Sequence, residues 1–176
     1  MDDVCLASRY RAAGFTLLEL LVSVSVLALS IYAVHGFTEL IATAGHRAAR
    51  QELKVMLALA RQESIMRNQR LTLCRAVEAD QCAGNALSGS HEWSSVLLFA
   101  DRDQDRLYSP SHDQLLRHIQ MPENMKVFWN RGEAISYQPD GSVTGYSNGT
   151  FSLSFEEGPE CRVVLALSGR IRESCY

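Results

Sequence analysis

The sequence predicts an α+β fold in which one long N-terminal helix packs on a mostly antiparallel β-sheet head. Two observations support this class. An apolar stretch near the N-terminus continues without a break into a stretch with helical periodicity, and the remainder is a series of short strand-like runs separated by turn residues. With 176 residues, of which 47% are hydrophobic and 21% are charged, the chain suits a single globular head with one appended apolar element.

The apolar stretch is long enough to cross a membrane. Residues 20–34 carry no charge, and residues 15–37 together reach the ~20 positions that a membrane-spanning helix needs. Glu19 lies within this span, and a carboxylate in hydrocarbon is costly enough to indicate a function; alternatively, Glu19 only reaches the membrane surface near the start of the span. A secretory signal peptide is a competing interpretation, but the apolar run here leads directly into a helical pattern.

After residue 37 the helix is expected to become amphipathic. Apolar side chains recur at mostly three- and four-residue steps against arginines and glutamates as far as Arg67. The apolar positions are Leu40, Ile41, Ala44, Ala48, Leu53, Met56, Leu57 and Ala60. We therefore expect one helix from residue 15 to about residue 67, with residues 38–70 as its amphipathic half and its end.

Residues 71–176 are expected to form the β-rich head. Apolar and β-branched runs predict strands at 71–74, 93–100, 114–119, 125–129, 134–138, 151–155, 162–166 and 170–174. Residues 79–90 are small and polar and predict a loop, residues 101–106 predict a charged turn, and Pro139-Asp140-Gly141 is a strong turn signal.

The start of the apolar stretch carries a specific motif. Gly14-Phe15-Thr16-Leu17-Leu18-Glu19-Leu20-Leu21-Val22 resembles the class III signal of type IV prepilins and type II secretion pseudopilins. The resemblance implies that residues 1–14 are a leader, which a prepilin peptidase removes after Gly14, and that Phe15 becomes the N-methylated first residue. It also gives Glu19 a partner, the terminal amine of a neighbouring subunit, because opposite charges attract strongly in a low dielectric.

The same resemblance implies a location and a set of partners. Residues 15–37 would cross the inner membrane once, with the head in the periplasm, and the assembled protein would lie in a pilus filament. The implied partners are other pilins and minor pilins, the prepilin peptidase and the inner-membrane assembly platform. Arg9 and Arg11 suit this orientation, because Asp2 and Asp3 contribute little to the positive-inside rule.

The order of motifs in the head adds a second resemblance. The long helix is followed by a strand that ends in cysteine, by Trp93 and Phe99-Ala100-Asp101, by Tyr137-Gln138-Pro139-Asp140-Gly141, and by Val163-Val164-Leu165-Ala166-Leu167-Ser168-Gly169-Arg170. This order resembles the GspH/FimT family of minor pilins and pseudopilins over nearly the whole chain. The resemblance implies a type IV pilin-like fold.

The cysteines predict two disulfides in the head. Cys5 lies in the expected leader, which leaves Cys74, Cys82, Cys161 and Cys175 in a head that faces an oxidising compartment. Four cysteines allow three pairings. Proximity in sequence favours Cys74 with Cys82 across a loop and Cys161 with Cys175 across a hairpin.

The C-terminal hairpin predicts a row of arginines. If residues 167–169 form a three-residue loop, the register sets Cys161 opposite Cys175 and Arg162 opposite Ser174. Period-two alternation then places three arginines on the face that points away from the apolar positions. These arginines are Arg162, Arg170 and Arg172.

This arginine face has two interpretations. Charged faces of antiparallel sheets are usually solvated surface; alternatively, the face is a small anion-binding ridge. Gly169-Arg170-Ile171-Arg172 resembles the Gly-Arg-x-Arg motif near the end of FimT-type minor pilins linked to DNA uptake, which implies phosphate binding by Arg170 and Arg172 with Arg162 as a third contact. The net charge of -3, from 17 Lys+Arg and 20 Asp+Glu, requires any such site to be a local patch.

Neither a metal site nor an enzymatic site is expected. Asp101, Asp103 and Asp105 alternate as in a calcium loop, but Arg106 stands where a glycine is expected and His112 stands where a bidentate glutamate is expected, so a solvated turn is the preferred interpretation. The chain has no Cys-x-x-C, its histidines form no ligand-spaced cluster, and no nucleophile motif places Ser, His and Asp together. We expect no cofactor.

The expected function is therefore that of a minor type IV pilin, which is incorporated into pili and supports their biogenesis. The expected specialisation is binding of double-stranded DNA, without sequence preference, for uptake in natural transformation. Two alternatives stay open. One is a structural minor pilin that primes assembly without binding DNA, and the other is a type II secretion pseudopilin.

Overall fold

The computed structural model describes residues 16–155 and 158–176, apart from the side chains of residues 33–43. The chain divides into two compact units, Met1–Ala42 and Thr43–Tyr176. Helix α1, Leu17–Arg67, has 51 residues and runs through the boundary between them. The predicted long helix is confirmed, and its observed end at Arg67 is followed by Asn68 in a left-handed conformation, with φ 50°.

The described part of the first unit is the start of α1. All side chains from 16 to 32 are exposed. Within residues 16–155 and 158–176, no helical segment combines the length and the apolar character that crossing a membrane requires. The predicted span at 15–37 includes Phe15 and the side chains of 33–37, which lie outside the described residues.

In the second unit, α1 buries one stripe of side chains. The buried positions follow the helical period, and each is at most 3% exposed: Ala49, Leu53, Met56, Leu57 and Ala60. Ala48, which the sequence pattern placed on this stripe, is exposed, and its neighbour Ala49 takes the buried position. Leu40 and Ile41 lie outside the described side chains.

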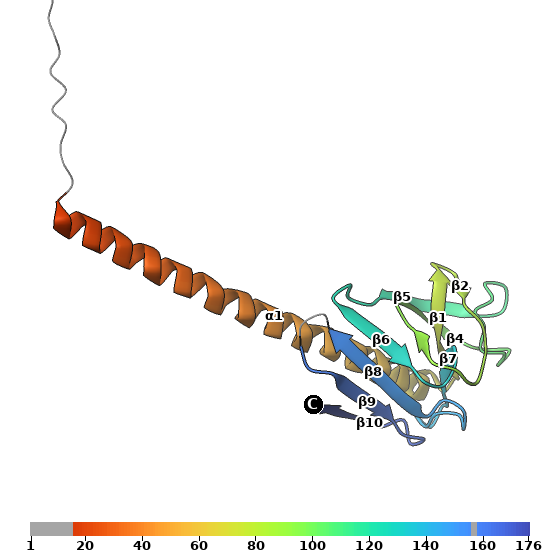
Figure 1. Ribbon diagram of the computed structural model, residues 1–176. Coiled ribbons are helices and arrows are strands. Elements are labelled where there is room, and N and C mark those ends of the chain that lie inside the picture. Colours follow the sequence, from red (N-terminus) through yellow and green to blue (C-terminus); the bar gives the residue numbers. More distant parts are fainter. Residues whose placement is uncertain (1–15, 156–157) are drawn as a thin grey trace, which may run out of the picture. The chain divides into compact units, whose positions relative to one another are not determined.

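The head consists of two antiparallel sheets (Figure 1). The first contains β1 (Leu71–Glu78), β2 (Gln81–Cys82), β4 (Ser95–Ala100), β5 (Gln114–Gln120) and β7 (Ala134–Tyr137), in the order β2-β1-β4-β5 with β7 also paired to β1. The second contains β3 (His91–Glu92), β6 (Met125–Trp129), β8 (Gly149–Phe155), β9 (Cys161–Leu165) and β10 (Ile171–Cys175), in the order β10-β9-β8-β6-β3.

One strand prediction and one loop prediction are corrected in this part of the chain. The predicted strand at 93–100 starts at Ser95, and the short strand β3 precedes it. β3 pairs with β6 in the second sheet, whereas β4 pairs with β1 and β5 in the first, so the chain changes sheet at residues 93–94. The predicted loop at 79–90 contains β2, because Cys82 pairs with Ala76 of β1.

One core joins the helix to both sheets. The fully buried rings of Trp93, Trp129 and Phe151 lie at its centre, with Phe151 4.3 Å from Trp129 and 5.7 Å from Trp93 between ring centroids. Leu53 and Leu57 of α1 belong to the same cluster. Aromatic side chains each bury a large apolar area, so this cluster contributes strongly to the packing of the second sheet on the helix.

Candidate functional site

The C-terminal hairpin has the predicted register. Cys175 pairs with Cys161 and Ser174 pairs with Arg162 across β9 and β10. The turn is closed by the amides of Ala166 and Gly169: Ala166 donates to the Arg170 carbonyl and Gly169 donates to the Ala166 carbonyl, both at 2.9 Å. Arg162 and Arg172 are therefore held in a regular strand pair, and Arg170 lies between the closing turn and β10.

Both predicted disulfides are present in the structure. Cys161 is bonded to Cys175 at the open end of the hairpin, and Cys74 of β1 is bonded to Cys82 of β2. The first bond ties β10, the last strand and an edge strand of the second sheet, to its neighbour β9. This bond limits how far β10 can separate from β9, which keeps the arginine face in place.

Gly169 has a structural reason to be glycine. Its φ is +71°, and a Cβ at this position would lie 2.0 Å from the carbonyl oxygen of Gly141. The turn of the hairpin thus packs directly on the Pro139-Asp140-Gly141 turn, where Arg61 Nε also donates to the Gly141 carbonyl at 3.0 Å. Gly169 itself is buried, and in this structure its left-handed backbone sets the turn.

The two faces of the hairpin differ sharply. Cys161, Val163 and Leu165 point into the core and are at most 1% exposed. The predicted row of arginines lies on the opposite face, where all three are exposed: Arg162, Arg170 and Arg172. By register, Arg162 and Arg172 are diagonal neighbours across the strand pair, close enough for one extended ligand to contact both.

The register extends this face to Lys126, which the sequence analysis missed. Lys126 of β6 pairs with Ser154 of β8, and Ser152 of β8 pairs with Arg162, so Lys126 and Arg162 lie on the same side of the second sheet. The alternation of apolar and polar residues in β6 indicates this position, because Met125, Val127 and Trp129 are buried and Lys126 is exposed. We call the side chains of Lys126, Arg162, Arg170 and Arg172 the basic face.

The acidic residue next to Arg172 in the sequence does not lie on the basic face. Glu173 alternates to the other side of β10, where its carboxylate accepts from Arg50 Nη1 at 3.1 Å and from Lys54 Nζ at 2.6 Å. Its charge is therefore paired with cations of α1. The carbonyl of exposed Glu160 accepts from the Tyr176 amide at 3.0 Å, so one acidic residue lies at the open end of the hairpin.

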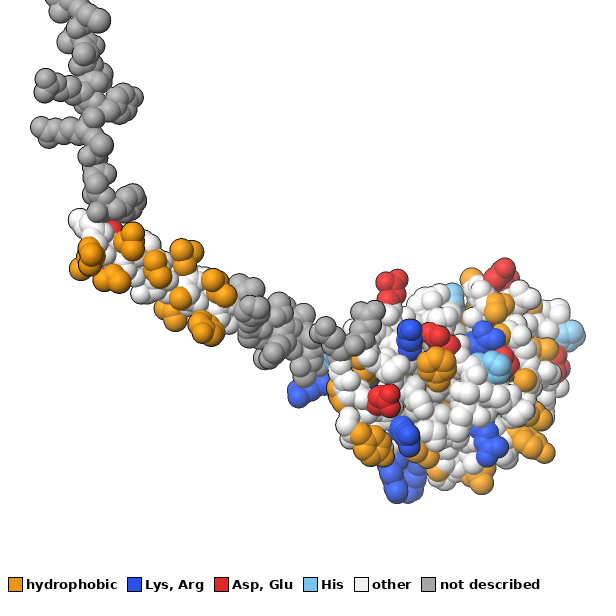
Figure 2. All heavy atoms as spheres, in the orientation of Figure 1, with side chains coloured by type: hydrophobic (Ala, Val, Ile, Leu, Met, Phe, Trp, Pro, Cys, Tyr) orange, Lys and Arg blue, Asp and Glu red, His pale blue; other side chains and the backbone are white. Residues whose placement is uncertain are grey.

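The surface view agrees with this distribution. In Figure 2, Lys and Arg side chains gather at the lower edge of the head, in the area where Figure 1 places β9 and β10. The guanidinium of Arg162 also lies 5.8 Å from the ring centroid of Tyr176. That contact holds one cation over an aromatic ring without using its hydrogen-bond donors.

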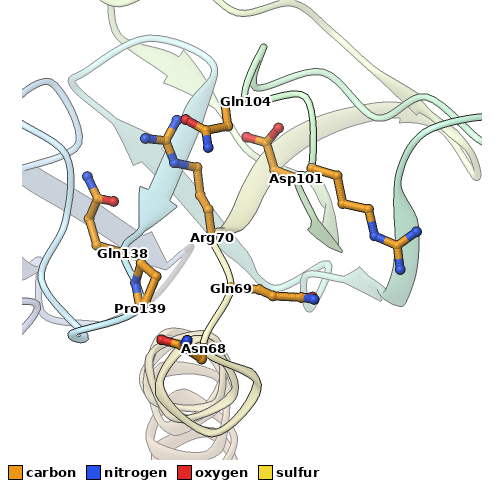
Figure 3. A pocket seen from close by; sticks show the side chains of 8 residues that line it. Asn68, Gln69, Arg70, Asp101, Gln104, Gln138 and Pro139 are labelled. Carbon is orange, nitrogen blue, oxygen red and sulfur yellow. The ribbon is translucent and has the colours of Figure 1, made fainter.

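A cavity of about 440 Å³ lies where α1 meets the first sheet. It is lined by polar side chains, including those of Gln69, Arg70, Asp101, Gln104 and Gln138 (Figure 3). Asp101 is 2% exposed, and this burial raises the pKa of its carboxyl above the usual range. The sequence analysis expected an exposed turn here, so the burial of Asp101 is a correction.

The N-terminal motif is only partly described. Gly14 and Phe15 lie outside the described residues. Glu19 Oε2 accepts from the amide of Thr16 at 3.2 Å and from its hydroxyl at 3.1 Å, while Thr16 Oγ1 accepts from the Glu19 amide at 3.3 Å. These reciprocal bonds form a capping box at the start of α1, a role for Glu19 that the sequence analysis missed although Thr-x-x-Glu is its signature.

Comparisons with known proteins agree on one family. The family model of the type II transport protein GspH matches residues 49–169, and the model of the prokaryotic N-terminal methylation motif matches residues 9–31. No protein with a curated description matches the chain significantly.

Solved structures with the same fold include the type IV minor pilin FimU of Pseudomonas aeruginosa. One crystal form aligns with a TM-score of 0.54 at 16% identity over 73% of this chain and 91% of FimU, and a second gives 0.54 at 14% over 73% and 87%. The minor pseudopilin EpsH of Vibrio cholerae aligns with a TM-score of 0.47 at 17% identity over 71% of this chain and 92% of EpsH. Because the GspH model covers more than half of the sequence, this chain belongs to the GspH family of type IV minor pilins and pseudopilins.

Proposed function

We propose that the chain is a minor type IV pilin that is incorporated into pili, supports their biogenesis and binds double-stranded DNA for uptake. The observation that carries the DNA-binding part is the basic face, on which three arginines of one disulfide-closed hairpin point to solvent. Family membership supports the filament role, because minor pilins and pseudopilins assemble with other pilins.

The first step in this function is processing at the membrane. A prepilin peptidase cleaves after Gly14 and Phe15 is N-methylated, and the match to the methylation motif at residues 9–31 supports this step. The helix then crosses the inner membrane once, with the head in the periplasm. Exposed leucines and valines along residues 17–32 support this location, since an apolar surface of this extent needs lipid or protein against it.

The mature N-terminus offers a direct test of processing. The mass of the protein isolated from filaments should correspond to a chain that starts at N-methylated Phe15. A filament protein that still starts at Met1 would contradict the proposal.

Glu19 is proposed to guide assembly by pairing with the terminal amine of a neighbouring subunit. Two variants separate this role from the capping box. Glu19→Gln keeps a side chain that can accept the Thr16 bonds but removes the charge, whereas Glu19→Ala removes both. If the ion pair guides assembly, both variants should fail to enter pili; normal incorporation of Glu19→Gln would leave only the helix cap as its role.

The basic face suits a phosphate backbone in chemistry and spacing. A guanidinium offers parallel N–H donors that match two phosphate oxygens. Arg172 lies in β10 and Arg170 directly precedes that strand, so an extended backbone places their Cα atoms about 6.6 Å apart. Contacts of this kind position DNA without reading its sequence.

The affinity of one head should be low. With three or four phosphates neutralised, the slope of log K against log salt should be about -3 to -4 on duplex DNA, which implies micromolar or weaker binding that high salt abolishes. Several copies in a filament would raise the overall affinity, because each further contact is intramolecular.

The experiment is a fluorescence anisotropy titration of the full chain in non-ionic detergent with a labelled duplex, at low and raised salt. Arg170→Gln/Arg172→Gln should weaken binding at least tenfold and flatten the salt slope by about two. The matched control is Arg47→Gln/Arg117→Gln, which removes the same charge from two exposed arginines outside the basic face. Equal losses in both double variants would show only a response to net charge, and no binding by the wild type would favour a purely structural minor pilin.

The family description favours a second candidate, a type II secretion pseudopilin, because the matching model is that of a type II transport protein. Deletion of the gene separates the candidates. Loss of pili and of transformation would support the pilin, whereas loss of protein secretion with pili intact would support the pseudopilin.

A further inference from the structure

The connection between β4 and β5 brings three carboxylates together. Asp101 directly follows β4, Asp113 directly precedes β5, and Asp103 lies between them. One oxygen of each carboxylate lies within 4.8 Å of the others. Asp101 and Asp113 are only 2% and 8% exposed, so two of the three charges are buried. Buried carboxylates need counter-charges or several hydrogen bonds.

The hydrogen bonds around the cluster leave one oxygen unused. Asp101 Oδ2 accepts from the Thr72 hydroxyl at 2.7 Å, but Asp101 Oδ1 is buried and has no hydrogen-bond partner within residues 16–155 and 158–176. Asp113 accepts one amide on each oxygen, from Arg102 and from Ser109, both at 2.9 Å. Each Asp113 oxygen keeps a second lone pair. The cluster can therefore offer oxygen ligands from all three aspartates.

The backbone compensates for the two departures from a calcium loop, which are Arg106 in place of a glycine and His112 in place of an acidic ligand. Arg106, at the position of the expected glycine, has the left-handed conformation that a glycine would adopt there, with φ 70°. His112, at the position of the expected acidic ligand, is followed by Asp113, and it is Asp113 that joins the cluster. One residue of additional loop length thus restores an acidic ligand at the end of the connection.

We propose that Asp101, Asp103 and Asp113 bind a calcium ion that joins the end of β4 to the start of β5. Carboxylate oxygens without nitrogen or sulfur ligands suit a hard cation. Two oxygens bound to one Ca²⁺ at 2.3–2.6 Å lie at most about 5 Å apart, which is compatible with the observed grouping, whereas Mg²⁺ requires shorter and more regular distances. This site is separate from the basic face and does not depend on DNA binding.

Nearby arginines lower the affinity that we expect for calcium at this site. The positive charge of Arg70 lowers the pKa of the Asp101 carboxyl, opposing the effect of burial, and Arg106 also interacts electrostatically with Asp101. Arg106 Nη2 donates to the Ala134 carbonyl, and Figure 3 shows Gln104 between the Arg70 guanidinium and the Asp101 carboxylate. These cations offset part of the negative charge. We therefore expect a Kd of about 10⁻⁴–10⁻³ M, the range of extracellular calcium modules.

The test uses the full chain in non-ionic detergent, stripped with chelator and titrated with CaCl₂ by calorimetry, alongside thermal unfolding with and without 5 mM CaCl₂. Wild type should bind one Ca²⁺ per chain, and its Tm should rise by about 3–6 °C. MgCl₂ at the same ionic strength should produce less than half of this rise. No calcium binding, or an equal rise with magnesium, would overturn the proposal.

Asp103→Asn is the decisive variant. Asp103 is exposed, so its replacement should leave the fold intact while removing one charged ligand. We expect at least a tenfold weaker Kd and loss of most of the Tm rise. The matched control is Asp80→Asn, which makes the same change in an exposed turn outside the cluster and should behave as wild type. An unchanged Kd in Asp103→Asn, or equal weakening in Asp80→Asn, would reject the site.

Discussion

The two parts of α1 use the same secondary structure in opposite ways. From residue 17 to residue 32 every side chain is exposed, and Leu17, Leu21 and Leu29 have 80%, 58% and 70% of their surface uncovered. In the head, the same helix buries Leu53 and Leu57 to within 1% of complete coverage. The sequence of the head part is explained by packing within the chain, whereas the apolar surface of the first part has no such explanation among the described residues.

The difference is one of pattern as well as burial. The head part is amphipathic, which is typical of a helix on the surface of a globular core. The first part is mostly apolar and buries no stripe of side chains among the described residues, which is typical of a helix surrounded by lipid or protein. Its serine hydroxyls form hydrogen bonds within the helix: Ser23, Ser25 and Ser30 each donate to the carbonyl four residues earlier at 2.7–2.8 Å. Such bonds let a serine lie in an apolar environment.

The largest expected effect compares one leucine from each part. Leu57→Ala should lower the free energy of unfolding of the head by about 2–5 kcal/mol, because it leaves a cavity in a packed core. Leu21→Ala should change it by less than about 0.5 kcal/mol, because its side chain belongs to no core among the described residues. Denaturant unfolding followed by tryptophan fluorescence measures both, since Trp93 and Trp129 lie in the core. Similar losses would show that the two parts fold as one unit.

The disulfides should give the next largest effect, and only in the head. Cys161→Ser/Cys175→Ser opens a loop with a sequence separation of 14 and should cost about 3 kcal/mol. Cys74→Ser/Cys82→Ser opens one with a separation of 8 and should cost slightly less. Thermal unfolding of the oxidised proteins measures the difference. No change in Tm in either variant would show that strand pairing alone holds these segments.

Local pattern was sufficient to predict much of the fold. The stop of α1 at Arg67, the register of Arg162 with Ser174 and the pairing of Cys161 with Cys175 all follow from periodicity and turn residues, which depend on neighbours in sequence. The division of the strands into two sheets was not predicted. It depends on how β3 and β4 pair with strands distant in sequence, and nothing at residues 93–94 indicates the change of sheet.

The candidate sites show the same limit. The alternation that placed three arginines on one face also applied to Lys126, but assigning Lys126 to that face required the order β9-β8-β6. The burial of Asp101 was equally out of reach, because an acidic turn is normally solvated and this one is covered by Arg70 and Gln104 from both sides of the cavity. Glu19 was assigned to a partner subunit, and its bonds to Thr16 were overlooked.

Gly169 provides a smaller effect that again belongs to the head. Gly169→Ala forces a side chain into a left-handed residue and against the Gly141 carbonyl, so it should cost about 1–3 kcal/mol. Gly145→Ala is the matched control: a Cβ at Gly145 meets no atom within 4 Å, and its change should be within about 1 kcal/mol of zero. Urea unfolding measures both, and equal stability of the two variants would show that the hairpin turn moves without cost.

The smallest expected effect is a pH dependence that also arises in the head. Arg75 donates to Glu133 through Nε at 2.6 Å and Nη2 at 3.0 Å, and these bonds lower the pKa of the Glu133 carboxyl. His91 Nδ1 lies 3.3 Å from the same carboxylate. Because the pKa is lower in the folded chain, the stabilisation is complete above the unfolded value of about 4.3 and is lost as the pH falls through the folded value.

Glu133→Gln should therefore reduce stability by about 1 kcal/mol at pH 7 and by progressively less as the pH falls towards 3, so that its unfolding curve depends less on acid than that of the wild type. Glu78→Gln, which alters an exposed carboxylate on β1, should keep the acid dependence of the wild type. Thermal unfolding at pH 7, 5, 4 and 3 measures this difference. Parallel pH profiles for wild type and Glu133→Gln would mean that the Arg75 pair contributes little, and that acid sensitivity arises from other carboxylates. Buried Asp101 is not one of them: its pKa is raised in the folded chain, so its contribution to stability increases as the pH falls.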